Sequence, residues 1–98
     1  MKIEKNVKNG KACFALEGRL DTTTAPELEK ELQNEIEGIT ALTLDLSKLD
    51  YISSAGLRVL LSAHKAMSRK GCMKVTNVNE VVREVFDVTG FSDILDIE

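Results

Sequence analysis

The sequence predicts a single α/β domain whose sheet is mixed but mostly parallel and contains four to five strands. Strand-like and helix-like segments alternate along the chain with short connections, which is typical of crossover units. Such crossovers are right-handed and leave their strands parallel. An Asn-Gly pair near the start adds a hairpin, and therefore one antiparallel edge. Because 98 residues suit one domain, residues 1–98 are interpreted as one unit.

The N-terminal hairpin is predicted from Asn9 and Gly10, which separate two strand-like segments. Asn-Gly readily adopts the two positive φ angles of a type I′ turn. In the second of these strands, Ala12, Phe14 and Leu16 alternate with other residues. That period of two indicates a strand with one buried face.

A first helix is expected to begin at Thr24, whose side chain would cap it, with Glu27 completing a capping box. Pro26 suits the first turn because its missing N–H would be unpaired there in any case. Gly38 is expected to end the helix. Its glutamates fit a solvated helix face better than an acidic docking surface. Apolar residues recur every fourth position and form one stripe: Leu28, Leu32 and Ile36.

The rest of the chain continues the alternation of strands and helices. Residues 41–46 are largely apolar, as expected for a short strand covered on both faces. A second helix is predicted over about residues 54–70 and is apolar around most of its surface. A strand at residues 72–76 and a helix at residues 79–89 follow. The tail, residues 91–97, has room for a last short strand or helical turn.

Composition excludes several classes of function. The apolar fraction of 43% and the charged fraction of 30% are ordinary for a soluble globular domain. A net charge of −3 gives no electrostatic basis for binding nucleic acid. No apolar run approaches the length of a membrane span, so no membrane insertion is predicted. The charged N-terminus lacks the apolar core of a signal peptide, so a cytoplasmic location is expected.

Cys13 and Cys72 are far apart in the sequence, and each lies in a predicted strand. Without a secretory signal, both are expected to be reduced and to act as small packing residues. They form neither a Cys-x-x-Cys motif nor a cluster with histidines. No metal site and no cofactor are therefore predicted.

The segment DYISSAGL places Ser53 and Ser54 where a strand gives way to a helix. In open α/β sheets, ligands and partners gather at the carboxyl ends of strands, next to helix N-termini. One hydroxyl there can cap the helix, at a gain of about 1 kcal/mol. A second serine, followed by Ala55 and Gly56 with little side-chain cover, indicates an accessible patch.

Catalysis by Ser54 is not predicted. A nucleophilic serine needs a base within hydrogen-bond reach. The sole histidine, His64, lies ten residues further along the same predicted helix, about 15 Å away. The chain also lacks the glycine-rich loops that cradle phosphates. Because a helix N-terminus alone can attract an anion, weak nucleotide binding stays open as an alternative.

Together these residues resemble the signature of STAS domains, and in particular that of bacterial anti-sigma factor antagonists. The likeness covers essentially the whole chain in order, without a large insertion. The segments that carry it are Gly18-Arg19-Leu20-Asp21, Thr24-Ala25, Leu44-Asp45-Leu46-Ser47, Ile52-Ser53-Ser54-Ala55-Gly56-Leu57 and Val85-Phe86-Asp87-Val88-Thr89-Gly90-Phe91.

The resemblance implies a protein that binds a serine-kinase anti-sigma factor and thereby frees a sigma factor. In the family the kinase phosphorylates a serine that matches Ser54, which blocks binding, and a PP2C-type phosphatase reverses the modification. Asp21 matches an acid that lies beside the acceptor. Ser53 stands where the family often has aspartate, so it is a competing acceptor. The expected partner-binding residues are Asp21, Thr22, Thr23, Ser53, Ser54, Ala55, Gly56 and Leu57.

Charge explains how such a switch would work. A phosphoserine adds about −1.5 to −2 charge, which is favourable at a helix N-terminus. A partner packed on Ala55, Gly56 and Leu57 would instead face a buried dianion, so the switch is expected to act on the interface. The alternative function is that of a STAS subunit that binds and regulates an ABC-type ATPase in lipid transport without a phosphoswitch.

Overall fold

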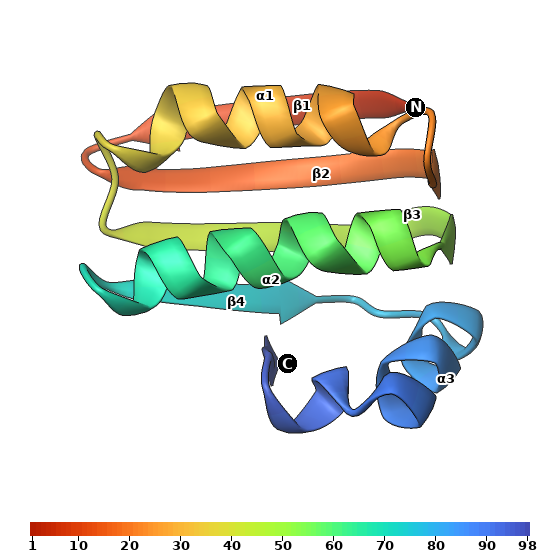
Figure 1. Ribbon diagram of the computed structural model, residues 1–98. Coiled ribbons are helices and arrows are strands. Elements are labelled where there is room, and N and C mark those ends of the chain that lie inside the picture. The colour runs from red at the N-terminus through yellow and green to blue at the C-terminus, as the bar shows by residue number, and fades with distance from the viewer.

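The computed structural model describes residues 1–98 and contains one five-stranded sheet in the order β1-β2-β3-β4-β5 (Figure 1). β1 pairs antiparallel with β2, and the other neighbours are parallel, which confirms the predicted mixed and mostly parallel sheet. The elements are β1 (Lys2–Lys8), β2 (Lys11–Leu20), α1 (Ala25–Ile36), β3 (Ala41–Ile52), α2 (Ser54–Ser68), β4 (Cys72–Thr76), α3 (Glu80–Thr89), the 3-10 helix η1 (Phe91–Asp93) and β5 (Asp96–Ile97).

The hairpin forms at the predicted turn. Asn9 and Gly10 both have positive φ, 53° and 78°, and Lys8 pairs with Lys11 across the turn. These are the φ signs of a type I′ turn, whose twist matches that of the strands. In β2 the predicted inward residues Ala12, Phe14 and Leu16 are all buried.

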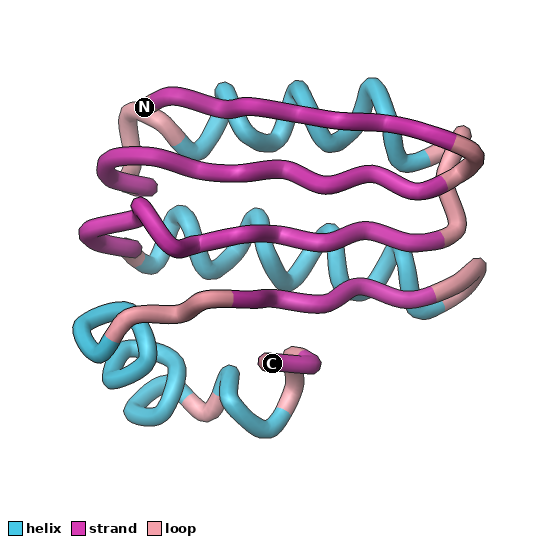
Figure 2. The backbone as a smooth tube through the Cα atoms, turned by 180° about the vertical axis from the view of Figure 1, so that it is seen from behind, coloured by secondary structure: helices cyan, strands magenta, loops and turns pink.

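Both crossover helices, α1 and α2, cover the same face of the sheet, and the view from behind leaves the other face open (Figures 1 and 2). Each crossover moves one strand further in the same direction, and right-handed crossovers of that kind put their helices on one side. The prediction that residues 41–46 are covered on both faces was therefore wrong. The strand is also longer than predicted, because β3 continues to Ile52 and stays paired with β2 up to Leu20.

The core lies between the sheet and the helices and contains only apolar side chains. It joins β2 and β3 to α1, α2 and α3, and Phe14 and Phe86 are its largest fully buried members. Asn79 caps α3 by accepting from the N–H of Val82 at 2.9 Å. Gly90 ends α3 in the left-handed conformation, at φ 83°. None of the helices is both long and apolar enough to cross a membrane.

The C-terminal end of α1 is held by Lys70 rather than by Gly38. Gly38 lies in the turn after the helix, but it does not adopt the left-handed conformation that was expected of a terminating glycine. The ammonium group of Lys70 instead donates hydrogen bonds to the carbonyl oxygens of Ile36 and Glu37, the latter at 3.0 Å. A cation is favourable at this end of a helix.

The two cysteines are free, and both are exposed rather than packed in the core. Cys13 alternates with the buried residues of β2 and therefore points to the open face of the sheet. Cys72 is exposed at the start of β4. The prediction that they act as small packing residues was therefore wrong.

Candidate functional site

Two turns lie next to each other at the carboxyl ends of β2 and β3, on the right of Figure 1. The first turn, residues 21–24, joins β2 to α1, and the second consists of Ser53, which joins β3 to α2, and the first residues of that helix, 54–56. Leu20 pairs with Ile52 at the strand ends, and the N–H of Ser53 donates to the carbonyl oxygen of Leu20 at 2.9 Å. Parallel pairing of these strands therefore brings the two segments of the sequence motif together.

Asp21 organises the first turn. Its Oδ1 accepts from the N–H of Thr23 at 3.0 Å, from the Thr23 hydroxyl at 2.8 Å and from the N–H of Thr24 at 3.2 Å. These hydrogen bonds, with that of the Thr23 hydroxyl the strongest, hold the pKa of Asp21 below its usual range. Asp21 therefore stays ionised and fixes the turn, while Thr22 and Thr23 are exposed beside it.

Thr24 does not cap α1 as the sequence predicted. Its hydroxyl donates to the carbonyl oxygen of Arg19 at 2.8 Å and accepts from the N–H of Asp21 at 2.8 Å. The side chain thus faces back toward β2, and the backbone of Thr24 is already helical, so the predicted capping box does not form. The N–H of Thr24 donates instead to Asp21 Oδ1.

Arg19 and Tyr51 form a cation–π pair beside the turns. The guanidinium carbon of Arg19 lies 4.4 Å from the centroid of the Tyr51 ring. Arg19 Nε is also 3.8 Å from Asp21 Oδ2. Arg19 and Tyr51 are both exposed, so their cation–π pair lends little stability but gives the surface an aromatic and a cationic group.

Ser53 and Ser54 have different environments. Ser53 is the N-cap of α2, with extended backbone, and its hydroxyl oxygen accepts from the N–H of Gly56 at 3.5 Å. Ser54 is the first residue of the helix, is exposed, and makes no hydrogen bond through its side chain. Its hydroxyl is therefore the more accessible of the two.

Gly56 and Leu57 are buried, whereas the sequence predicted that they lie at the partner-binding surface. A Cβ on Gly56 would come within 2.7 Å of Leu20 Cγ and 2.8 Å of Ile52 Cγ1, so the residue lets α2 pack closely on the ends of β2 and β3. These two positions support the turn from within. Of the four residues that begin α2, only Ser54 and Ala55 reach the surface.

A hollow between the starts of α1 and α2 joins the two turns on the helical face of the molecule. It is lined by Thr22 from the first turn and Ala55 from the second, together with Glu29 and Arg58. Sequence reasoning missed these last two residues, although Arg58 lies one helical turn after Ser54 and could have been found from that spacing. Pro26, Ala25 and Val59 complete the lining.

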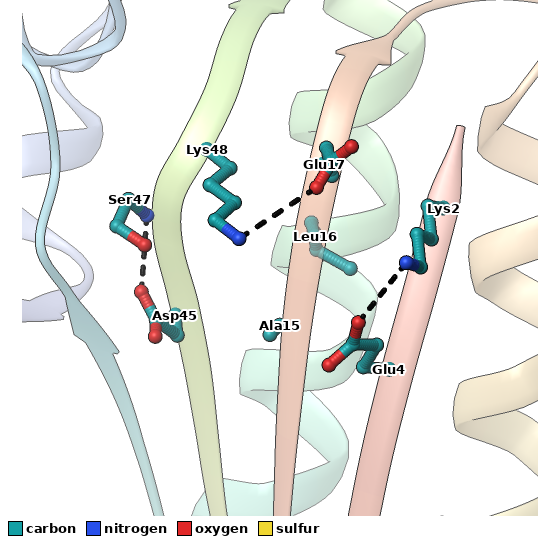
Figure 3. A pocket seen from close by; sticks show the side chains of 8 residues that line it. All are labelled: Lys2, Glu4, Ala15, Leu16, Glu17, Asp45, Ser47 and Lys48. Atoms are coloured by element: carbon teal, nitrogen blue, oxygen red, sulfur yellow. Dashed lines mark hydrogen bonds and ion pairs between the residues drawn. The ribbon is translucent and has the colours of Figure 1, made fainter.

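A second hollow lies on the open face of the sheet, across β1, β2 and β3 (Figure 3). Its charged side chains pair with one another: Lys2 with Glu4 at 3.3 Å and Lys48 with Glu17 at 3.9 Å. Asp45 accepts from the N–H of Ser47 at 3.0 Å. This hollow is separate from the two turns, which lie at the ends of the strands.

The residues around Ser54 do not form a known catalytic arrangement. His64 lies ten residues further along α2, about 15 Å from Ser54 at the helical rise per residue. No cluster of three or more histidine, cysteine, aspartate or glutamate side chains could hold a metal ion. The site offers an exposed hydroxyl, a hydrogen-bonded acidic turn and a neighbouring arginine, which suit modification and recognition by another protein.

Comparison with known proteins assigns the family. The family model for the STAS domain matches residues 2–98. The chain belongs to the STAS domain family. BtrV of Bordetella bronchiseptica, a candidate anti-sigma factor antagonist, is 36% identical over 99% of this chain and 85% of its own length. The anti-sigma-B factor antagonist of Bacillus subtilis is 33% identical over 82% of this chain and 74% of its own length.

Solved structures have the same fold. The structure of the Bacillus cell fate determinant SpoIIAA in its phosphorylated form superposes with a TM-score of 0.77, covering 99% of this chain and 91% of that one. The sequence identity is 17%, so this likeness concerns the fold alone. The α/β class predicted from the sequence is thus confirmed both by the structure itself and by its neighbours.

Proposed function

We propose that this STAS domain is an anti-sigma factor antagonist, which binds a serine-kinase anti-sigma factor and so releases a sigma factor. The observation that carries the proposal is the exposed Ser54 at the start of α2, beside the Asp21 turn, in a chain whose relatives are named as such antagonists. No relative named here is a subunit of an ABC transporter, so the antagonist function is preferred to the lipid-transport alternative.

The proposed interface consists of the surface residues of the two turns. Thr22 and Thr23 are exposed, and Ala55 borders the hollow that also contains Thr22. Asp21 and Ser53 contribute mainly by fixing the shape of the turns, through their hydrogen bonds to Thr23, Thr24 and Gly56. Gly56 and Leu57, which the sequence placed in the interface, act from the core.

Phosphorylation of Ser54 is the proposed control. The Ser54 Oγ would attack the γ-phosphorus of ATP bound to the kinase, forming a new O–P bond while the bond to the β–γ bridging oxygen breaks. ADP leaves, and a base of the kinase takes the hydroxyl proton. Ser54 is preferred to Ser53 as the acceptor because the Ser53 oxygen faces the N–H of Gly56 and caps the helix. A PP2C-type phosphatase would hydrolyse the phosphoserine and restore binding.

The phosphate would act on the interface and leave the fold intact. Ser54 is exposed, so a phosphate there displaces no core side chain. It also lies at the N-terminus of a helix, where negative charge is favourable. A partner that covers Ala55 and Thr22 would have to bury about −1.5 to −2 charge against its own surface, which is strongly unfavourable.

The protein itself is proposed to have no catalytic turnover and to reside in the cytoplasm with its partners. The test uses the purified protein, the anti-sigma kinase from the same organism and ATP. Peptide mass spectrometry should find one phosphate on Ser54, and a binding assay should find weaker association after modification. Modification of Ser53 alone, or unchanged binding after full modification of Ser54, would contradict the proposal.

A further inference from the structure

Arg58 is an exposed cation one helical turn after Ser54, and it has no partner. Its side chain makes no ion pair, hydrogen bond or cation–π contact in the structure. By contrast, Arg19 lies near Asp21, and Arg83 lies 3.8 Å from Asp87. The one acidic residue that lines the same hollow, Glu29, forms no ion pair with Arg58. The guanidinium is therefore free to bind another anion.

Ser54 and Arg58 lie on the same side of α2. Residues four apart on a helix have Cβ atoms about 5–6 Å apart, within reach of an arginine fork. An anion four residues before a cation is also the favourable order along a helix. The first turn of α2 contains no acidic residue, whereas α1 has Glu27 and α3 has Glu80 in theirs. A phosphate on Ser54 would thus meet Arg58 with no competing carboxylate in its own turn.

We propose that Arg58 is the internal counter-ion of phosphorylated Ser54. The inference rests on the proposed function only in that Ser54 is modified. A phosphate accepts two parallel hydrogen bonds from a guanidinium, and such pairs are among the stronger ones in proteins. In the unmodified protein Arg58 stands at the hollow between Thr22 and Ala55, where a partner carboxylate can reach it.

Phosphorylation would therefore change the surface twice. It adds a dianion at the start of α2, and it draws the guanidinium of Arg58 away from the hollow and toward Ser54. A partner that uses an acidic side chain to contact Arg58 would lose that contact as it meets the new negative charge. Arg58 thereby specifies the chemistry of the partner, an acidic group beside small or apolar ones.

The experiment measures the phosphate itself and needs no kinase or partner. Phosphoserine is incorporated at position 54 during translation, and the phosphorus NMR chemical shift of the protein is followed from about pH 4.5 to about pH 8. This range surrounds the second pKa of phosphoserine, which is about 6. A nearby cation favours the dianion and lowers this pKa. The phosphoserine of the wild type should titrate about 0.3 pKa unit below that of Arg58→Gln, as expected for an exposed pair four residues apart.

The controls separate this pair from general effects of charge. Arg69→Gln removes another exposed and unpaired arginine, near the far end of α2, and should titrate with the wild type. Arg58→Lys should keep at least half of the pKa difference between the wild type and Arg58→Gln. The difference between wild type and Arg58→Gln should shrink at about 1 M salt, where charges are screened within about 3 Å.

Three results would overturn the inference. The phosphoserine pKa could be the same in the wild type and Arg58→Gln. Arg69→Gln could raise it as much as Arg58→Gln does, or Arg19→Gln could raise it instead. Failure of the proposed function is distinguishable. If the kinase does not modify Ser54, the function fails while the titration can still establish the pair. If modification blocks binding but Arg58→Gln titrates like the wild type, only the role of Arg58 fails.

Discussion

Gly56→Ala is expected to destabilise the domain, because α2 packs directly on the ends of β2 and β3 at this position. The new methyl group would lie 2.7 Å from Leu20 Cγ, 2.8 Å from Ile52 Cγ1 and 3.0 Å from Leu20 Cδ2. Leu20 is 0% exposed and Ile52 is 1% exposed, so neither side chain can swing into solvent to make room. The helix or the strand ends must shift instead.

The expected size follows from two opposing effects. Overpacking of a filled core costs about 1–3 kcal/mol. Replacing glycine by alanine in a helix gains at most about 1 kcal/mol, and less in the first turn, where Gly56 lies. The net loss in the free energy of unfolding should be about 1–2 kcal/mol, which lowers the Tm of a domain of this size by about 5–10 °C.

Urea unfolding and a thermal melt measure both quantities. Gly38→Ala is the matched control, because a Cβ there meets only the carbonyl oxygen of Glu35 at 3.8 Å and the backbone is not left-handed. That variant should stay within about 0.5 kcal/mol of the wild type. A Gly56→Ala protein as stable as Gly38→Ala would refute the close packing described for the start of α2.

Two further predictions concern other parts of the fold. Gly71→Ala should destabilise the domain more than Gly56→Ala in the same urea assay, because a Cβ would lie 1.7 Å from the backbone oxygen of Thr40. That oxygen is held in place because it accepts a hydrogen bond from the N–H of Cys72. An equal or smaller loss of stability would contradict this prediction. The N–H of Ser47 and the Asn77 side chain lower the pKa of Asp45, so its contribution to stability is present above about pH 4 and lost as the pH falls through the lowered value. Asp45→Asn should accordingly lose less stability than the wild type between pH 5 and pH 2, and an identical acid profile would exclude this role.

Most of the fold could be predicted from the sequence because its signals are local. The Asn9-Gly10 turn and the periodic apolar residues of α1 both act within a few residues. The error about the faces of the sheet came from a long-range relation. That one face of the sheet stays open depends on the direction of two successive crossovers, so residues 41–46 are covered on one face only.

The site shows the same division. The motif placed Ser53 and Ser54 at the start of a helix, as observed. The burial of Gly56 could not be read from the motif, because the residue packs against Leu20, which lies far away in the sequence. The turn chemistry of Thr24 was also missed, since its hydroxyl bonds backward to Arg19 and Asp21 instead of forward into the helix.

Charge on Ser54 is proposed to control binding to the anti-sigma kinase. The most direct measurement is the affinity of that kinase for the wild type, Ser54→Ala and Ser54→Asp, by calorimetry at one salt concentration. Ser54→Ala should bind like the wild type, because Ser53 supplies the cap of α2. Ser54→Asp should bind at least 10-fold more weakly. Burying a charge in an interface costs several kcal/mol, of which an aspartate at the rim would incur only a part. Equal affinity of Ser54→Asp and wild type would contradict the account.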